Sequence, residues 1–269
     1  MAVFAPWLAP HDTSDVGTLD LMQALRPPVW LEGGDWAYLL GTDDQGRDML
    51  SGIIFGARTS LLVSGVAVLL ATLLGTAVGL FCGWVGGRPD AVLMRIAEVQ
   101  LSFPAILIVL LIDGLGRTAV STDLHNVAAV PVLIIAIALS NWVQIARTVR
   151  GSSMAEKNKE YVQAARVLGI HPAAILLRHI LPNIFAPVLV IATLGIAGAI
   201  LTEATLSFLG VGVPPTQPSL GTLIRFGNNF LISGEWWMTV FPGLALVLLA
   251  LSVNIVGDWL RDVLNPKLS

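Results

Sequence analysis

Apolar residues follow one another in long stretches along this chain, which is the pattern of helices that cross a membrane. Such a helix needs about 20 mostly apolar residues. Four stretches reach this length almost without charge, the third of them interrupted by a single acid, Glu203. They predict four spans, centred near 62–84, 126–146, 184–209 and 238–258.

A fifth, weaker span is predicted between Asp90 and Asp113. Residues 99–112 carry no charge, whereas Arg95 and Glu98 precede them. These two residues are three apart, so they share a helix face and can pair near one membrane edge. Pro104 predicts a kink, and we also treat it as a residue of the pathway through the membrane.

The first nine residues are apolar but too short to span a membrane, and we interpret them as the outer end of an N-terminal helix. We therefore expect an all-α polytopic membrane protein with five complete transmembrane helices and the remnant of a sixth. The predicted organisation is an outer segment over 1–57, which holds that remnant, and a transmembrane domain over 58–265.

Composition supports a membrane protein and excludes several other classes. Hydrophobic residues make up 55% of the 269 residues and charged residues only 12%, against about 25% charged residues in a typical soluble domain. A net charge of −3 provides no basic excess for nucleic acid. The single cysteine excludes an internal disulfide framework, and the four histidines lack metal-ligand spacing, so we expect no metal site.

Lys and Arg set the expected orientation, because cytoplasmic loops carry an excess of them. Ten of the 15 basic residues fall on the side of the 147–182 loop and the C-terminus, and five on the other. We therefore expect this loop and the C-terminus to be cytoplasmic and the 1–57 segment to face outside.

The cytoplasmic loop contains a predicted helix, tight turn and second helix. Gly169 stands where a glycine ends a helix, and Pro172 suits the first turn of the next. Helical spacing places four residues on one semi-apolar face: Tyr161, Ala164, Ala165 and Leu168. The two alanines would let a partner surface approach closely.

The order Gln163-Ala164-Ala165, then Gly169, then Leu181-Pro182 resembles the "EAA" loop of bacterial ATP-binding-cassette importer permeases. Two positions depart from that pattern, because Gln163 replaces the family's glutamate and His179 its isoleucine. Further similarity lies in 40–48 with 56–61 and in 203–212 with Pro214 and Pro215. Together these blocks resemble the C-type permease subunit of the dipeptide, oligopeptide and nickel branch.

This resemblance implies a transport subunit rather than an enzyme. It would form half of a pathway for short peptides across the bacterial cytoplasmic (inner) membrane, or for nickel, glutathione or a metallophore. A coupling helix would dock on an ATPase, and the residues implied for it are Glu160, Tyr161, Gln163, Ala164, Ala165, Leu168, Gly169, His171 and Pro172. The implied partners are a homologous second permease, two ATPases, an extracytoplasmic solute-binding protein and membrane lipid.

The chain itself is expected to bind no cofactor, and ATP and Mg would be used by the partner subunits. No Gly-Lys pair occurs in the sequence, so a phosphate-binding P-loop is absent. A membrane enzyme or a stand-alone channel is the alternative from a different class.

Several positions have both a functional and a structural interpretation. Glu203 and Ser207 could line the pathway, or the acid could make a structural hydrogen bond to a neighbouring helix. Residues proposed to dock the receptor could equally form a turn or a connector: Asp43, Asp44, Arg47, Pro214 and Pro215. Gly75, Gly79 and Gly83 permit close helix packing, either against the second permease or inside the subunit.

Overall fold

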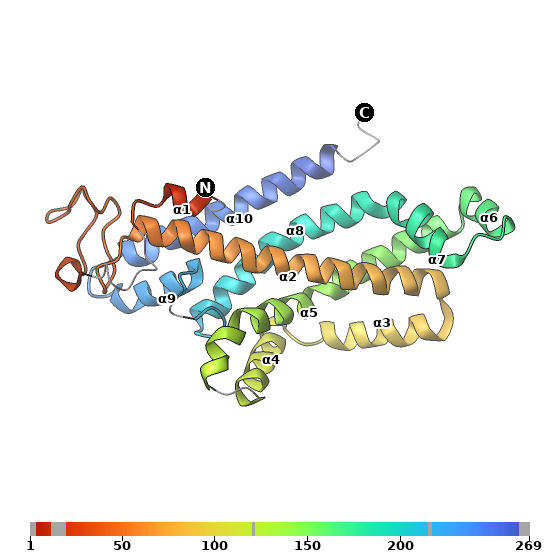
Figure 1. Ribbon diagram of the computed structural model, residues 1–269, viewed down its shortest axis with the longest axis horizontal. Coiled ribbons are helices and arrows are strands. Elements are labelled where there is room, and N and C mark those ends of the chain that lie inside the picture. Colours follow the sequence, from red (N-terminus) through yellow and green to blue (C-terminus); the bar gives the residue numbers. More distant parts are fainter. Residues whose placement is uncertain (1–3, 12–19, 120–121, 215–216, 264–269) are drawn as a thin grey trace. The chain divides into compact units, whose positions relative to one another are not determined.

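The computed structural model describes residues 4–11, 20–119, 122–214 and 217–263, and every regular element in these ranges is a helix. Figure 1 shows the elements in chain order. They are α1 (Ala5–Leu8), η3 (Leu21–Gln23), α2 (Met49–Val85), α3 (Gly87–Leu101), α4 (Ala105–Ala119), α5 (Thr122–Lys157), α6 (Glu160–Val167), α7 (Pro172–Ile175), η4 (Leu176–Ile180), α8 (Leu181–Phe208), α9 (Leu220–Phe230) and α10 (Trp237–Val263). The predicted all-α class is confirmed.

Four described helices are long and apolar enough to cross a membrane, and their spans are Met49–Val85, Ala128–Lys157, Pro172–Phe208 and Trp237–Val263. The third of these runs through α7, the π-helical turn η4 and α8. Pro182 explains the wide turn, because proline has no N–H and its ring clashes with the carbonyl four residues earlier. All four spans agree with the hydrophobic stretches in the sequence.

The predicted fifth span is a broken one, which corrects the expectation of a complete helix with a kink. Gly87–Leu101 and Ile106–Ile112 meet at 96°. Pro104 lies at the break, and its carbonyl accepts the first hydrogen bond of α4, from Leu107 N at 2.9 Å. The residue before a proline is disfavoured in the helical region, so α3 ends before Pro104. The predicted pair is present, with Arg95 Nη1 3.0 Å from Glu98 Oε2.

The chain packs as two compact units. The first comprises Met1–Gly65, Ile112–Ile134 and Gly198–Ser252, and the second Val66–Leu111, Ile135–Ala197 and Val253–Ser269. These units are defined by packing within the chain. The boundary at residue 57 between an outer segment and a transmembrane domain stays a prediction.

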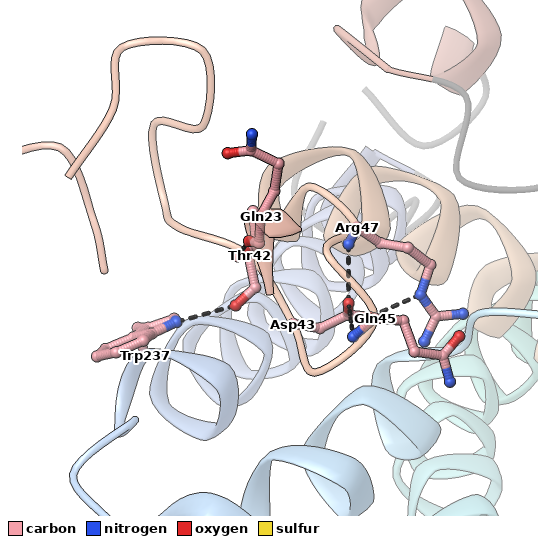
Figure 2. A network of polar contacts seen from close by, with 6 residues as sticks. All are labelled: Gln23, Thr42, Asp43, Gln45, Arg47 and Trp237. Carbon is pink, nitrogen blue, oxygen red and sulfur yellow. Dashed lines mark hydrogen bonds and ion pairs between the residues drawn. The ribbon is translucent and has the colours of Figure 1, made fainter. Parts of the chain in front are cut away.

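In the first unit, an aromatic core joins the start of α2, the 20–48 segment and the start of α10. Met49, Trp237 and Met238 are buried at its centre. Trp237 Nε1 donates to the carbonyl of Thr42 at 3.2 Å (Figure 2). The ring of Trp30 meets Phe241 edge to face, with centroids 5.9 Å apart. The 20–48 segment is therefore held against two helix ends rather than extended away from them.

Close approach between α8 and α9 forms a second feature of the first unit. A Cβ at Gly221 would lie 2.3 Å from the carbonyl oxygen of Ala204. A capping box begins α9, in which the side chains of Ser219 and Thr222 each bond the other's backbone N–H. The beginning of α9 is thereby placed against the turn of α8 that carries Glu203.

In the second unit, α2 and α5 approach each other along a row of glycines. A Cβ at Gly75 would lie 2.7 Å from the carbonyl oxygen of Trp142, and one at Gly79 would lie 2.6 Å from that of Ala146. At Gly83 the nearest atom would be Ser153 Cβ, at 2.7 Å. This face is used for packing inside the chain, which is the structural alternative for these glycines.

An ion pair joins α3 to α5 in the same unit. Arg150 Nε and Nη2 donate to the two carboxylate oxygens of Asp90, at 2.5 and 2.6 Å. Asp90 is buried. Bidentate arginine–carboxylate pairs fix geometry as well as contributing energy, so the beginning of α3 has a defined position on α5.

We expect Gly79→Ala to destabilise the protein, by about 1–3 kcal/mol or more, because an added Cβ meets a backbone carbonyl that cannot move aside. Thermal unfolding of the purified chain in detergent measures this effect. Gly65→Ala is the matched control on the same helix, since a Cβ there meets nothing within 4 Å. Equal melting temperatures for the two variants would contradict the proposed role of the glycine row.

Candidate functional site

Residues 160–172, called the elbow below, form the helix, turn and second helix that the sequence predicts. Gly169 has a φ of +73°. Its N–H donates to the carbonyl of Arg166 at 3.0 Å, and Ile170 N donates to that of Ala165 at 3.1 Å. These are the two bonds of a Schellman motif, which requires a left-handed residue and therefore favours glycine. The prediction that Gly169 ends the first helix of the elbow is confirmed.

The second arm of the elbow begins with its own cap. His171 Nδ1 accepts from Ala173 N at 3.3 Å, and Pro172 occupies the first turn of α7 as predicted. Proline suits this position because its fixed φ is helical and the missing N–H would have no partner in the helix. Glu160 begins the first arm, where an acid complements the helix dipole.

The two sides of α6 differ from the predicted arrangement. Val162 and Ala165 are buried in a core that also contains Ile175 and Ile180, whereas Ala164 and Leu168 are exposed. The predicted semi-apolar face of Tyr161, Ala164, Ala165 and Leu168 is therefore divided, because Ala165 is buried and Tyr161 half-buried while the other two are exposed. Packing against α7 and η4 selects the Val162–Ala165 side, and helical spacing alone could not choose it.

An apolar surface remains on the outside of the elbow. Val167 is 88% exposed and Leu168 77% exposed, and Ala164 and Gln163 are exposed beside them. Val167 is not among the residues predicted from the sequence. Its signal was an aliphatic residue directly before Leu168. We call Ala164, Val167 and Leu168 the apolar surface of the elbow.

Polar contacts of Tyr161 join α6 to the end of α5. Its hydroxyl donates to Glu156 Oε2 at 2.6 Å, and Lys159 Nζ lies 2.7 Å from Glu156 Oε1. Burial, together with the hydrogen bond to Glu156 and the charge of that carboxylate, raises the pKa of Tyr161 to about 12. The neutral phenol is thus the form that this contact stabilises.

Glu203 lies in a sealed polar cluster of the first unit. It is 0% exposed and Ser207 is 1% exposed. Ser207 Oγ donates to Glu203 Oε1 at 2.7 Å, and the hydroxyls of Ser60 and Ser219 also face this carboxyl group. Oε2 has no partner of good hydrogen-bond geometry among the described residues.

This burial bears on the residues predicted to line the pathway. Glu203 and Ser207 are closed off inside their own unit, so the contacts favour the structural alternative for both. Ser60 Oγ also accepts from Leu220 N at 3.3 Å, which ties α2 and α9 to the same cluster. Pro104 is exposed, at the break between α3 and α4.

Another side of α8 is open, and its residues are not among those predicted from the sequence. An open pocket of about 290 Å³ is lined mainly by apolar residues, among them Leu201 and Phe208 of α8 and Ile224 of α9, and Thr205 of α8 also lines it. The Thr205 hydroxyl is bound to the carbonyl of Leu201 at 2.7 Å. The signal in the sequence was the spacing of Leu201, Thr205 and Phe208, which are four and three residues apart and so share one face of a helix.

The 41–48 turn is built around Asp43, as Figure 2 shows. Asp43 Oδ1 accepts from Gln45 N at 2.9 Å and from Arg47 N at 2.8 Å, and Oδ2 accepts from Arg47 Nε at 2.6 Å. Asp48 Oδ2 accepts from Ser51 N at 2.9 Å, which caps the beginning of α2. These acids satisfy backbone donors.

The predicted receptor contacts are accordingly only partly accessible. Asp43 and Pro214 are buried, Asp44 and Arg47 are half-buried, and Pro215 lies outside the described residues. Burial and the adjacent Asp43 carboxylate raise the pKa of Asp44 above its usual value. The contacts therefore favour a structural role for the turn, as the alternative interpretation proposed.

Comparison with known proteins identifies the class of molecule that these elements form. Residues 75–269 match the family described as "Binding-protein-dependent transport system inner membrane component". The chain therefore belongs to this family, which makes it a transport subunit of the inner membrane and not an enzyme. This excludes the alternative of a membrane enzyme or a stand-alone channel.

Relatives narrow the resemblance to one branch. The dipeptide transport system permease protein DppC of Haemophilus influenzae is 39% identical over all of this chain and 86% of its own length. The di/tripeptide permease DppC of Pseudomonas aeruginosa is 39% identical over 99% of this chain and 84% of its own. The dipeptide transport system permease protein DppC of Escherichia coli is 40% identical over all of this chain and 85% of its own length.

Solved structures agree on the fold. The MetNI methionine ABC transporter, in an inward-facing form, matches 81% of this chain and 98% of its own chain with a TM-score of 0.64 at 17% identity. An amino acid ABC transporter matches 80% and 95% with a TM-score of 0.59 at 17% identity. At such identities the similarity concerns the fold alone.

If Glu203 has a structural role, Glu203→Gln should retain the stability of the protein, because the amide oxygen still accepts from Ser207. Glu203→Leu should lower stability by about 1–3 kcal/mol, since it leaves buried hydroxyls without a partner. Thermal unfolding in detergent measures both variants, with Thr205→Val on the open side of α8 as the control. A Gln variant as unstable as the Leu variant would show that the negative charge is required instead.

The sequence contains two tyrosines, so Tyr38→Phe leaves Tyr161 as the only phenol to titrate. We expect its ionisation, followed by absorbance at 295 nm, to have a midpoint near pH 12. Because the folded-state pKa is raised, the stability from this contact is present below about pH 10 and is lost as the pH rises towards 12. A midpoint near 10 would contradict the contact, and Tyr161→Phe in the same background should abolish the signal.

Proposed function

We propose that this chain is a permease subunit of an ATP-driven importer of short peptides. The observation that supports this proposal is its similarity, over nearly its whole length, to permeases named for dipeptide and di/tripeptide transport. A second, homologous permease would supply the other half of the pathway, and an extracytoplasmic solute-binding protein would deliver the peptide. The alternative substrates are nickel, glutathione and metallophores, and a failure to import peptides would favour them.

The apolar surface of the elbow is the proposed contact with the ATPases. Exposed aliphatic side chains such as Val167 and Leu168 are typical of a docking surface. Complete burial of each of these two side chains in a partner would contribute about 1.5–3 kcal/mol. Two ATPases would bind ATP with Mg, since the chain has no P-loop of its own.

The elbow and the C-terminus would face the cytoplasm, as the distribution of Lys and Arg indicates. Closure of the ATPases on ATP would then displace the elbow. Val162 and Ala165 share one core with residues of α2, α3, α5 and α8, so a displacement of α6 acts on all four helices in this unit. A partner thus shifts the balance between two states of the bundle, which is the essence of allosteric coupling.

To test this, the chain is purified with its candidate ATPases and second permease, reconstituted in liposomes and supplied with receptor and labelled dipeptide. We expect uptake that requires ATP. Val167→Asp should release the ATPases and reduce uptake to the background without ATP, because a charge replaces an apolar contact in the interface. Co-purification and uptake are measured on the same preparation.

The matched control is Ile232→Asp, which places the same charge at another fully exposed aliphatic residue, outside the elbow. It should retain ATPases and uptake. Normal uptake by the Val167 variant would refute the elbow as the docking surface. Import of nickel or glutathione with no import of dipeptide would refute the peptide substrate but not the coupling.

A further inference from the structure

The elbow is contacted by a helix to which it has no direct chain connection. In sequence it joins α5 to α7, yet Trp84, one residue before the end of α2, lies beneath it. The guanidinium carbon of Arg166, in the last turn of α6, is 4.4 Å from the centre of the Trp84 ring. At this distance a cation and an indole face attract each other.

Lys157 provides a second contact with the same tryptophan. Its Nζ lies 5.8 Å from the ring centre and donates a hydrogen bond to the Trp84 carbonyl. That carbonyl belongs to the last turn of α2, where helix carbonyls lack partners within the helix. The end of α5 and the last turn of α6 therefore meet on one residue of α2.

Trp84 is itself held in place by the packing of α2 on α5. The preceding residue, Gly83, lies so close to Ser153 that an added Cβ would be 2.7 Å from the Ser153 Cβ. The Trp84 side chain packs against the buried core that contains Val162 and Ala165. Movement of the Trp84 backbone relative to α5 would thus require separation of two closely packed helices.

The covalent links of α6, in contrast, are turns. Residues 158–159 precede α6 and residues 168–171 follow it, and neither segment is helical. A turn joins two helices less rigidly than a continuous helix would. A side-chain contact to a fixed position would restrict this freedom, and the Trp84–Arg166 pair is such a contact.

We propose that the Trp84–Arg166 contact is a third attachment of α6, in addition to the two turns that join it to the chain. Through this contact, displacement of α6 acts directly on α2. Both are positioning residues, because Arg166 acts through Trp84 and neither needs to touch the solute. This inference rests on the proposed coupling function of the elbow. It adds a direct side-chain contact with the end of α2 to the packing of the shared core.

The test measures solute molecules imported per ATP hydrolysed by the reconstituted complex. Trp84→Leu and Arg166→Gln should each lower this ratio about two- to fivefold, the range that corresponds to a cation–π contact at a partly exposed site. ATPase binding and hydrolysis should remain. Trp84→Phe and Arg166→Lys, which keep an aromatic face and a positive charge, should restore most of the ratio.

Matched controls remove the same residue types from α10. Trp259→Leu and Arg261→Gln alter exposed residues of that helix, and both should retain the wild-type ratio. The double variant of Trp84 and Arg166 should be no worse than either single one, because removal of one partner already abolishes the contact. Additive losses, or single variants with the wild-type ratio, would overturn the proposal.

Val167→Asp in the same experiment separates this inference from the function on which it rests. If that variant loses its ATPases while the Trp84 and Arg166 variants import normally, only the third attachment is refuted. If it keeps both ATPases and uptake, the coupling function of the elbow fails, and the third attachment fails with it. Should Trp84→Leu not accumulate, Arg166→Gln decides, since Arg166 is exposed.

Discussion

Close contact between α2 and α5 is the constraint on which the unit that carries the elbow depends. In lipid, apolar side chains gain little by moving from hydrocarbon to protein, so helices associate through tight packing and hydrogen bonds. Gly75, Gly79 and Gly83 allow the backbones to approach so closely that a methyl group would overlap a carbonyl. The end of α2 acquires a definite position in this way, and the buried side of α6 is packed against the core that forms there.

In the elbow, one side of the short helix α6 packs in the core while the other side stays exposed for a partner. An isolated helix of eight residues is unstable in water, so its stability comes from Val162 and Ala165 in the core and from the Schellman turn at Gly169. These contacts use one side of α6 only. The other side presents Val167 and Leu168, whose exposure has no advantage within the chain itself. Contact with a partner protein would bury these side chains, and the family to which the chain belongs suggests which partners to test.

Buried acids in this protein mainly organise backbone and helix junctions. Asp43 closes a turn, Asp48 caps α2, and Glu203 joins hydroxyl groups of α2 and α8 with that of Ser219. An ionisable residue in an apolar span is a natural candidate for a pathway. Burial changes this interpretation, because a side chain with no exposed surface in its own unit is already used by its neighbours. The open pocket beside Leu201 and Thr205 has the accessibility that Glu203 lacks.

The sequence alone determined the features that depend on neighbouring residues: the apolar spans, the turn at Gly169, Pro172 at the start of a helix, and the pair of Arg95 with Glu98. Each follows from hydropathy, backbone geometry or helical spacing, which act over a few residues. Only the tertiary structure decided which side of α6 is buried, that α3 and α4 meet at 96°, and that Arg166 lies over Trp84. These features depend on packing between segments far apart in the chain, and no local pattern specifies which distant side chain will occupy a given space.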